Sequence, residues 1–173
     1  LETERLILRP FTPADRAALH AAVYGSAAVM RFLPGGVTRT LEQTDSVINY
    51  FINHREQQGF GAWANIHRAD NRLIGQCGLN RLQVDGAVEV FYAIGEFCWG
   101  KGITPEAARA VVDDGFASVG LDRIIALAVP ENTPSRRVME KLGMAYEGLT
   151  TTYYNGAQLA LYTLTAAAWR AQN

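Results

Sequence analysis

The chain has 173 residues, of which 49% are apolar and 19% are charged, a size and composition typical of one soluble globular domain. The formal net charge of −1 excludes the strong positive field that recruits nucleic acid or anionic lipid. The longest apolar run, Ile124 to Val129, is far shorter than the roughly 18 residues of a membrane helix. Neither nucleic acid nor a membrane is therefore expected as a partner.

The first part of the chain reads as a strand followed by two helices. Leu6 to Leu8 is a short apolar strand, and Thr12 followed by Pro13 is a typical helix start. Apolar residues spaced as on one helix face predict a second helix from about Thr40 to Gln58.

A strand meander is predicted from Gly61 to Gly95, with a hairpin signal at Asp85-Gly86. The strands expected there are Ala62–His67, Leu73–Leu79 and Ala87–Ile94. The later elements are expected to be a helix at Pro105–Val119 with Gly120 at its C-cap, a strand at Arg123–Val129, a short helix opened by Asn132 and ended by Gly143, and a hairpin of Met144–Tyr153 with Gln158–Leu164. No repeat or linker interrupts these elements, so we predict one α/β unit.

Cysteine and histidine usage argues against a metal centre. Cys77 and Cys98 are the only cysteines and form no metal-type cluster, and the three histidines are scattered. We expect both thiols to be small buried side chains in a reducing compartment, which favours the cytoplasm, and we predict no metal site.

A candidate anion-binding site lies in the segment from Trp99 to Thr104, between a predicted strand and a predicted helix. Gly100 and Gly102 let the main chain approach a ligand closely, and Lys101 adds a positive charge. The unpaired N–H groups and the positive end of the helix dipole would all face the same anion. The pattern predicts a pyrophosphate site, with a simple turn and helix cap as the alternative.

Two other phosphate motifs do not fit this segment. A Walker loop needs Gly-Lys-Ser/Thr, whereas Lys101 precedes Gly102 here. A dinucleotide-binding fingerprint needs a small residue where this chain has Glu106. An ATP-binding α/β protein is therefore disfavoured.

Several blocks of the sequence follow one another in a recognisable order over nearly the whole chain. They are Glu4-Arg5-Leu6-Ile7-Leu8-Arg9-Pro10-Phe11, Trp99-Gly100-Lys101-Gly102-Ile103-Thr104-Pro105-Glu106-Ala107, Asn132-Thr133-Pro134-Ser135-Arg136-Arg137-Val138 with Lys141-Leu142-Gly143, and Tyr154-Asn155-Gly156. The set resembles the RimJ/RimL-like branch of the GNAT N-acetyltransferases, the ribosomal-protein N-terminal acetyltransferases. Its second block is similar to the acetyl-CoA pyrophosphate loop of that branch, WGKGxAxEA. We therefore expect one GNAT domain over residues 1–173.

The resemblance implies a fold and a co-substrate. The fold is an α/β arrangement with a mixed, mostly antiparallel twisted sheet, whose fourth and fifth strands run parallel and splay apart, flanked by about four helices. The co-substrate is acetyl-CoA, with its pantetheine arm in the gap between those two strands. The residues implied to hold it are Tyr92, Ala93, Ile94, Trp99, Gly100, Lys101, Gly102, Ile103, Thr104, Asn132, Ser135 and Arg137.

Two of these residues have a second interpretation. Asn132 could contact the pantetheine region or simply cap the following helix. Ser135 matches a family serine near the thiol sulfur, where its hydroxyl would protonate the departing thiolate, or it could bond to the first turn of its helix. Arg136 and Arg137 could reach the coenzyme phosphates or form a solvated helix face.

Glu89 is the main catalytic candidate. It interrupts an otherwise uncharged strand, and burying an unpaired carboxylate costs several kcal/mol, so Glu89 needs a partner, water or a raised pKa. As a base it would take a proton from the attacking amine, and the resemblance places a glutamate here too. It could instead face solvent or pair with an arginine such as Arg81.

The predicted activity is transfer of an acetyl group from acetyl-CoA to a primary amine by direct attack. The acceptor is a peptide N-terminus or a small amino compound, expected to contact Glu89 and Phe91, in a monomer or homodimer. Phe91 replaces a glycine common in the branch, and Met139 stands where many other GNAT enzymes have an acid tyrosine. These departures leave a non-catalytic acyl-CoA-binding module as the alternative.

Overall fold

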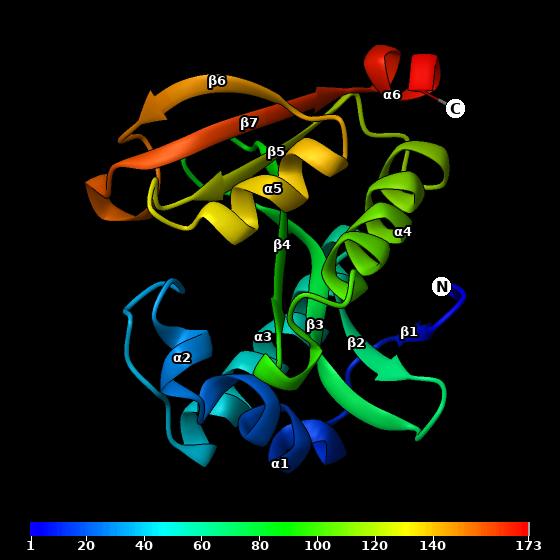
Figure 1. Cartoon of the computed structure of the whole chain (residues 1–173), viewed down its shortest axis with the longest axis vertical. Helices are drawn as coiled ribbons and strands as arrows, with labels where there is room; N and C mark the ends of the chain where they lie inside the picture. The colour runs from blue at the N-terminus through cyan, green and yellow to red at the C-terminus, as the bar shows by residue number, and fades with distance from the viewer. Residues whose placement is uncertain (173) are drawn as a thin grey trace.

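The computed structural model describes residues 1–172, and its framework is one seven-stranded sheet with strand order β1-β2-β3-β4-β5-β7-β6 (Figure 1). Only β4 and β5 pair in parallel, and every other neighbouring pair is antiparallel. This is the mixed, mostly antiparallel sheet that the family resemblance implied. No helix among residues 1–172 has both the length and the apolar character needed to cross a bilayer.

The strands are β1 (Leu6–Arg9), β2 (Ala62–His67), β3 (Arg72–Arg81), β4 (Val88–Ile94), β5 (Arg123–Ala128), β6 (Ala145–Thr150) and β7 (Leu159–Thr165). The α-helices are α1 (Arg16–Leu19), α2 (Ala27–Met30), α3 (Leu41–Gln58), α4 (Ile103–Ala117), α5 (Thr133–Lys141) and α6 (Ala166–Gln172). Short helical turns lie at η1 (Pro13–Asp15), η2 (His20–Tyr24), η3 (Glu96–Cys98) and η4 (Tyr154–Gly156).

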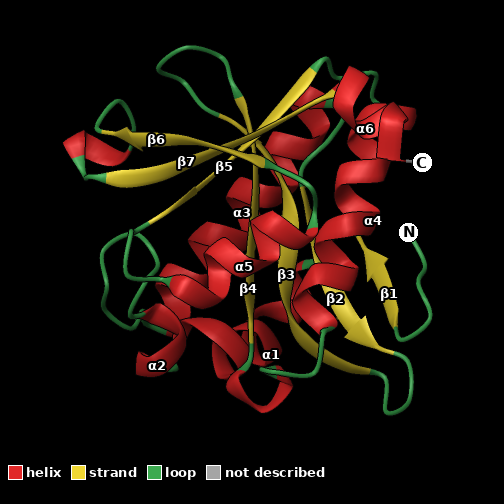
Figure 2. Cartoon of the chain, turned by 45° about the horizontal axis from the view of Figure 1, so that its top comes forward, coloured by secondary structure: helices red, strands yellow, loops and turns green. Residues whose placement is uncertain are grey.

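Two apolar clusters cover opposite faces of the N-terminal half of the sheet. Residues of α1, α2 and α3 pack on one face, and α4 packs on the other (Figure 2). Side chains alternate along a strand, so each strand of this half contributes to both clusters. In β4, Val88, Val90 and Ile94 join the α4 cluster, whereas Phe91 and Ala93 join the α3 cluster.

Helix boundaries follow the capping residues. Thr40 caps α3: its hydroxyl accepts a hydrogen bond from the Gln43 N–H, and the Gln43 side chain accepts one from the Thr40 N–H. Helix α4 begins at Ile103, two residues before the predicted start, because left-handed Gly102 precedes it. Gly120 has a φ of +76° but lies beyond the C-cap, which is Ser118.

The N-terminal helix is the clearest departure from the sequence expectation. Instead of one helix after Thr12, the chain forms a 3-10 turn, one α-helical turn and a π-helical turn in succession. Asp15 is nearly buried there, accepts hydrogen bonds from the Thr12 N–H and the Arg9 guanidinium, and so anchors the first turn. The short helices α2 and α6 were not predicted either.

Candidate active site

The parallel strands β4 and β5 separate after a single paired position. Glu89 and Ile125 are registered opposite each other, and no further pair joins the two strands among the described residues. Figures 1 and 2 show β4 and β5 running in different directions away from each other. A parallel pair that opens in this way leaves main-chain groups of β4 without a neighbouring strand.

The register of β4 identifies which main-chain groups face the gap. The Gly95 N–H donates to the Ile74 carbonyl at 2.8 Å, and the Leu82 N–H donates to the Ala87 carbonyl at 2.8 Å. Odd-numbered residues of this segment therefore bond to β3, and even-numbered ones face β5. Tyr92 thus presents its main chain to the gap, as expected. Ala93 presents its main chain to β3 instead, where it pairs with Gln76.

Ile94 is partly engaged within the protein. Its main chain lies on the gap side of β4, but its carbonyl accepts a hydrogen bond from the Trp99 indole Nε1 at 2.9 Å. Trp99 is half exposed and reaches back over the end of the strand. We therefore assign Trp99 a role in orienting the loop that it begins.

Glu89 is buried on the α3 side of β4, and only 4% of it is exposed. Its partner is the Tyr154 hydroxyl, which donates to Oε2 at 2.5 Å. Burial raises the pKa of Glu89 to about 7, although the hydrogen bond from Tyr154 opposes the rise. The suggested pairing with Arg81 is wrong, because that guanidinium donates to Gln58 and the Gly86 carbonyl.

Tyr154 reaches Glu89 from the turn between β6 and β7. Tyr154 and Asn155 both have positive φ angles, +50° and +59°, which are unusual for residues with side chains. The turn lies close to the hairpin that the sequence predicted at Asn155-Gly156. Its backbone places a tyrosine against a carboxylate 65 residues away in the sequence.

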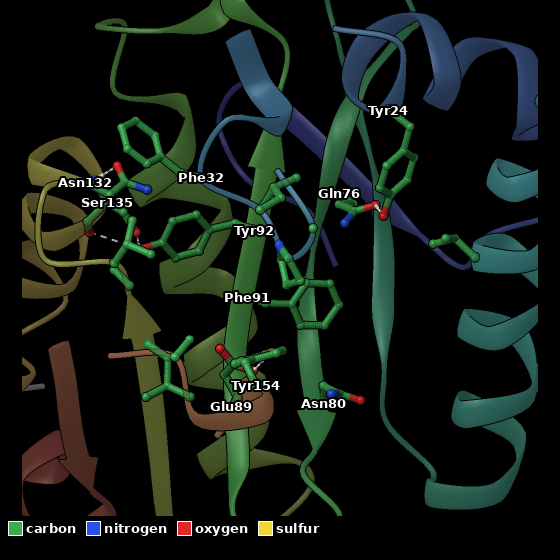
Figure 3. A pocket seen from close by; sticks show the side chains of 18 of the residues that line it. Tyr24, Phe32, Gln76, Asn80, Glu89, Phe91, Tyr92, Asn132, Ser135 and Tyr154 are labelled. Carbon is green, nitrogen blue, oxygen red and sulfur yellow. Dashed lines mark hydrogen bonds between the residues drawn. The ribbon is translucent and has the colours of Figure 1, made fainter. Parts of the chain in front are cut away.

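Glu89 and Tyr154 line a cavity of about 950 Å³ that also reaches β5, α5 and the loop before α3 (Figure 3). In the figure the Tyr92 side chain points toward Asn132 and Ser135, whereas Phe91 points the other way. The cavity therefore runs from one side of β4 to the other. Substrates on opposite sides of the sheet could meet beside Glu89.

On the α5 side, Tyr92 and Ser135 are in contact. The Tyr92 hydroxyl lies 3.1 Å from both the main-chain oxygen and the Oγ of Ser135. Burial raises the pKa of Tyr92 above its usual range, so this tyrosine stays protonated at neutral pH. Asn132 accepts a hydrogen bond from the Ser135 N–H at 3.2 Å, so it caps α5 and also lines the cavity. Met139 is buried in the same wall.

The segment from Trp99 to Thr104 has the form of an anion-binding loop. Gly100 and Gly102 adopt φ angles of +72° and +75°, which disfavour any residue with a side chain. Among residues 1–172, the N–H groups of Gly100, Lys101 and Gly102 donate to no main-chain carbonyl. The first-turn N–H groups of Ile103 and Thr104 have no intrahelical acceptor either. These donors fit a coenzyme diphosphate.

An ion pair braces this loop from the N-terminal segment. The Arg5 Nε donates to the Glu106 carboxylate at 2.6 Å, and the Arg5 Nη1 donates to the Lys101 carbonyl at 2.7 Å. Glu106 also accepts from the Thr3 hydroxyl and the Arg5 N–H. Burial acts to raise the pKa of Glu106, but the bonds from Thr3 and Arg5 outweigh it and lower the pKa overall.

The two arginines of α5 differ. Arg136 packs against Tyr162 and Tyr146, and its guanidinium donates to the Tyr162 hydroxyl and the Pro130 carbonyl. Arg136 therefore stabilises the fold. Arg137 is exposed on the helix.

Sequence reasoning missed several polar residues of the cavity. Gln76 interrupts an apolar strand as Glu89 does, so the same signal was available for it. Its carboxamide accepts from the Tyr24 hydroxyl at 2.9 Å (Figure 3). Tyr24 itself carried no such signal, because a tyrosine in an apolar helical pattern is an ordinary core residue. Tyr154 was noticed only for its motif.

The structure thus brings together a splayed parallel strand pair, a loop whose N–H groups have no main-chain acceptor within residues 1–172, and a buried carboxylate at the fork. Residues 5–145 match the family model described as the acetyltransferase (GNAT) domain. The chain belongs to the GNAT acetyltransferase family, and it is an acetyltransferase enzyme.

Individual relatives agree with this assignment. The chain is 33% identical over 155 residues to the uncharacterized N-acetyltransferase p20 of Bacillus licheniformis, covering 88% of this chain and 86% of that protein. A GNAT-family acetyltransferase from Bacillus anthracis superposes with a TM-score of 0.82 at 30% identity, covering 96% and 98% of the two chains. The ribosomal-protein-S5-alanine acetyltransferase of Vibrio fischeri shares the fold, with a TM-score of 0.80 at 20% identity over 98% and 97% of the chains.

Proposed function

We propose that this enzyme transfers an acetyl group from acetyl-CoA to a primary amine by direct attack within a ternary complex. The observation that carries the proposal is Glu89, a buried carboxylate with a pKa near 7 at the fork between β4 and β5. A base works best when its pKa lies near the working pH. Glu89 can therefore accept a proton from an amine that enters on the α3 side of the cavity.

The coenzyme would be held by main-chain groups. The N–H groups from Gly100 to Thr104 would bind the diphosphate, and the main chain of Tyr92 would bond to the pantetheine arm. Bound acetyl-CoA supplies the thioester that donates the acyl group. Holding both substrates in one cavity makes attack effectively unimolecular, so no covalent enzyme intermediate is required.

Ser135 would complete the proton transfers. It is the candidate acid for the leaving thiolate and would regain its proton from solvent, and the Tyr92 hydroxyl, 3.1 Å from the Ser135 Oγ, would hold the serine hydroxyl in place. The buried Met139 has no proton to give.

The fold shared with ribosomal-protein acetyltransferases supports a peptide N-terminus as the acceptor, and a small amino compound is the second candidate. An α-amino group, with a pKa of about 8, loses its proton to such a base far more easily than a lysine side chain, with a pKa of about 10.4. Two buried, unpaired cysteines fit a reducing compartment, and we place the enzyme in the cytoplasm as one domain over residues 1–173.

The test measures acetyl-CoA binding first and amine-dependent release of CoA second, with a panel of peptides and small amines. We expect binding and amine-dependent turnover. Binding with no turnover for any amine would favour the non-catalytic acyl-CoA-binding module, and absence of binding would refute the assigned coenzyme site.

A further inference from the structure

The charged side chains that line the cavity are few. Arg39 and Glu89 are the only charged residues among the described residues that line it. Glu89 is already bonded to Tyr154 and is largely buried. The lining therefore holds no second carboxylate for a second ammonium group.

Arg39 is held in place, yet its guanidinium makes no hydrogen bond or ion pair with any of the residues 1–172. Its N–H donates to the Tyr24 carbonyl at 2.8 Å, which anchors the end of the loop before α3. Its guanidinium carbon lies 5.0 Å from the centroid of the Tyr24 ring. The Tyr24 hydroxyl is fixed in turn by Gln76. The five ion pairs of the described chain engage other residues.

A half-buried, stacked guanidinium with unused donors is suited to binding an anion. Its planar fork matches the two oxygens of a carboxylate or phosphate, and stacking on a tyrosine limits the side-chain entropy lost on binding. Arg39 is separate from the N–H loop at the start of α4, since residues 99–104 do not line this cavity. An anion bound by Arg39 would therefore be distinct from the coenzyme diphosphate.

We infer that the acceptor is an amine that also carries a carboxylate or phosphate, with its amine beside Glu89 and its anion on Arg39; this inference rests on the proposed acyl transfer. The lining of the same cavity also includes Phe51 and Phe91, whose rings stack at 5.7 Å. An apolar part of the acceptor would pack against these rings. Polyamines and aminoglycosides would meet Arg39 with like charge.

The experiment compares kcat/KM for matched pairs of acceptors. Leucine and leucinamide differ in a carboxylate, O-phosphoethanolamine and ethanolamine differ in a phosphate, and spermidine represents polycations. A carboxylate raises the pKa of a neighbouring amine, so intrinsic reactivity at neutral pH favours leucinamide. We expect the enzyme to reverse this order and to prefer the anionic member of at least one pair by about tenfold or more, the scale of a charge-assisted hydrogen bond. Which pair responds distinguishes carboxylate from phosphate.

Two variants assign the effect to its residue. Arg39→Gln should remove the kcat/KM preference for the anionic member of each acceptor pair. Arg31→Gln is the matched control, because Arg31 lies over the Phe32 ring on the same segment but is exposed and does not line the cavity. The control should keep the preference.

A measurement of amine binding distinguishes failure of this inference from failure of the proposed function. Calorimetry with saturating CoA measures amine affinity in a complex that cannot react. Anionic amines that bind the wild-type protein tightly and Arg39→Gln weakly would support the inference even if no amine were acetylated, in which case the proposed activity alone fails. Three outcomes overturn the inference: equal or better use of neutral or polycationic amines, a preference that survives in Arg39→Gln, or a loss of CoA affinity in that variant.

Discussion

The loop from Trp99 to Thr104 offers a ligand its main chain, whereas the cavity around Glu89 offers side chains from segments far apart in the sequence. Main-chain donors depend on local conformation, so two glycines at positive φ and a helix start are sufficient. The Glu89 side depends on tertiary contacts, such as its bond to Tyr154. We therefore expect changes in backbone conformation to disable the Trp99–Thr104 loop, and the loss of single polar atoms to disable the cavity around Glu89.

The largest effect should come from Gly102→Glu. This change adds a side chain and a negative charge to the loop in which the N–H groups of Gly100, Lys101 and Gly102 have no main-chain acceptor among the described residues, so acetyl-CoA binding should become undetectable by calorimetry. Gly120→Glu is the control, because Gly120 has the same strained φ, +76°, with open space around it at the far end of α4. If both variants bound acetyl-CoA alike, the loop assignment would be lost.

Glu89→Gln should lower kcat by about 100-fold, at the lower end of the range for a lost general base, with little change in acetyl-CoA affinity. The wild-type rate should rise with pH through about 7 as Glu89 loses its proton, and the variant should lack this rise. Asp15→Asn is the control, since Asp15 is a nearly buried carboxylate outside the cavity. A variant with wild-type turnover across the pH range would remove Glu89 from the mechanism.

The pH dependence of protein stability is a second test of the raised pKa of Glu89. Its pKa is raised in the folded state, so the wild-type protein loses stability as pH increases from the ordinary carboxyl value of 4.5 toward 7. Gln has no proton to lose. The melting temperature of Glu89→Gln, relative to the wild type, should therefore increase between pH 5 and pH 8 on this linkage argument.

Tyr154→Phe should have a smaller effect. The hydrogen bond from Tyr154 lowers the pKa of Glu89, so its removal should raise that pKa and shift the pH–rate midpoint upward. Turnover at pH 7 should fall by roughly tenfold, the scale of one hydrogen bond to a charged group, and should recover at higher pH. Tyr153→Phe is matched to it, because Tyr153 bonds to Asp85 from the same turn but outside the cavity. An unshifted midpoint in Tyr154→Phe would show that Tyr154 does not tune the base.

Sequence reasoning worked best where the signal was local. The strand–loop–helix order and the helix start at Thr40 follow from periodicity and capping chemistry, and the structure confirms both. The single charge of Glu89 in an apolar strand indicated a carboxylate that needs a partner, water or a raised pKa, with a solvent-facing side chain as the alternative, and the structure shows that Glu89 is buried. Its partner could not be predicted, because Tyr154 reaches it only after β6, β7 and the turn between them have assembled.

The first helical region shows the opposite case. Its pattern predicted one helix after Thr12, but the chain changes helix type twice before Gly25. Tertiary contacts favour this distortion, since Tyr24 in the last turn bonds to Gln76 of β3. Local propensity is a weak guide when a buried polar contact decides the geometry.

The smallest expected effect tests whether the N–H loop depends on anything beyond its own backbone. Glu106→Gln keeps the size of the side chain but removes its charge, so it weakens the brace in which Arg5 also holds the Lys101 carbonyl. Arg5 is 39% exposed, and solvent screening keeps such a pair modest. We expect acetyl-CoA affinity to fall roughly threefold, within the range of a partly exposed ion pair.

The control for this brace is Asp45→Asn, which removes the exposed ion pair between Asp45 and Arg16 away from the loop and should leave acetyl-CoA affinity unchanged. The pKa of Glu106 is lowered by folding, so its stabilising contribution is present above the ordinary carboxyl pKa and is lost as pH falls through the lowered value. The stability gap between wild type and Glu106→Gln should accordingly narrow below about pH 4. The stability difference between wild type and Glu106→Gln could close at low pH while the acetyl-CoA affinity of the variant stays at the wild-type value. That result would mean that Arg5 and Glu106 stabilise only the fold, and that Gly100 and Gly102 position the N–H donors without them.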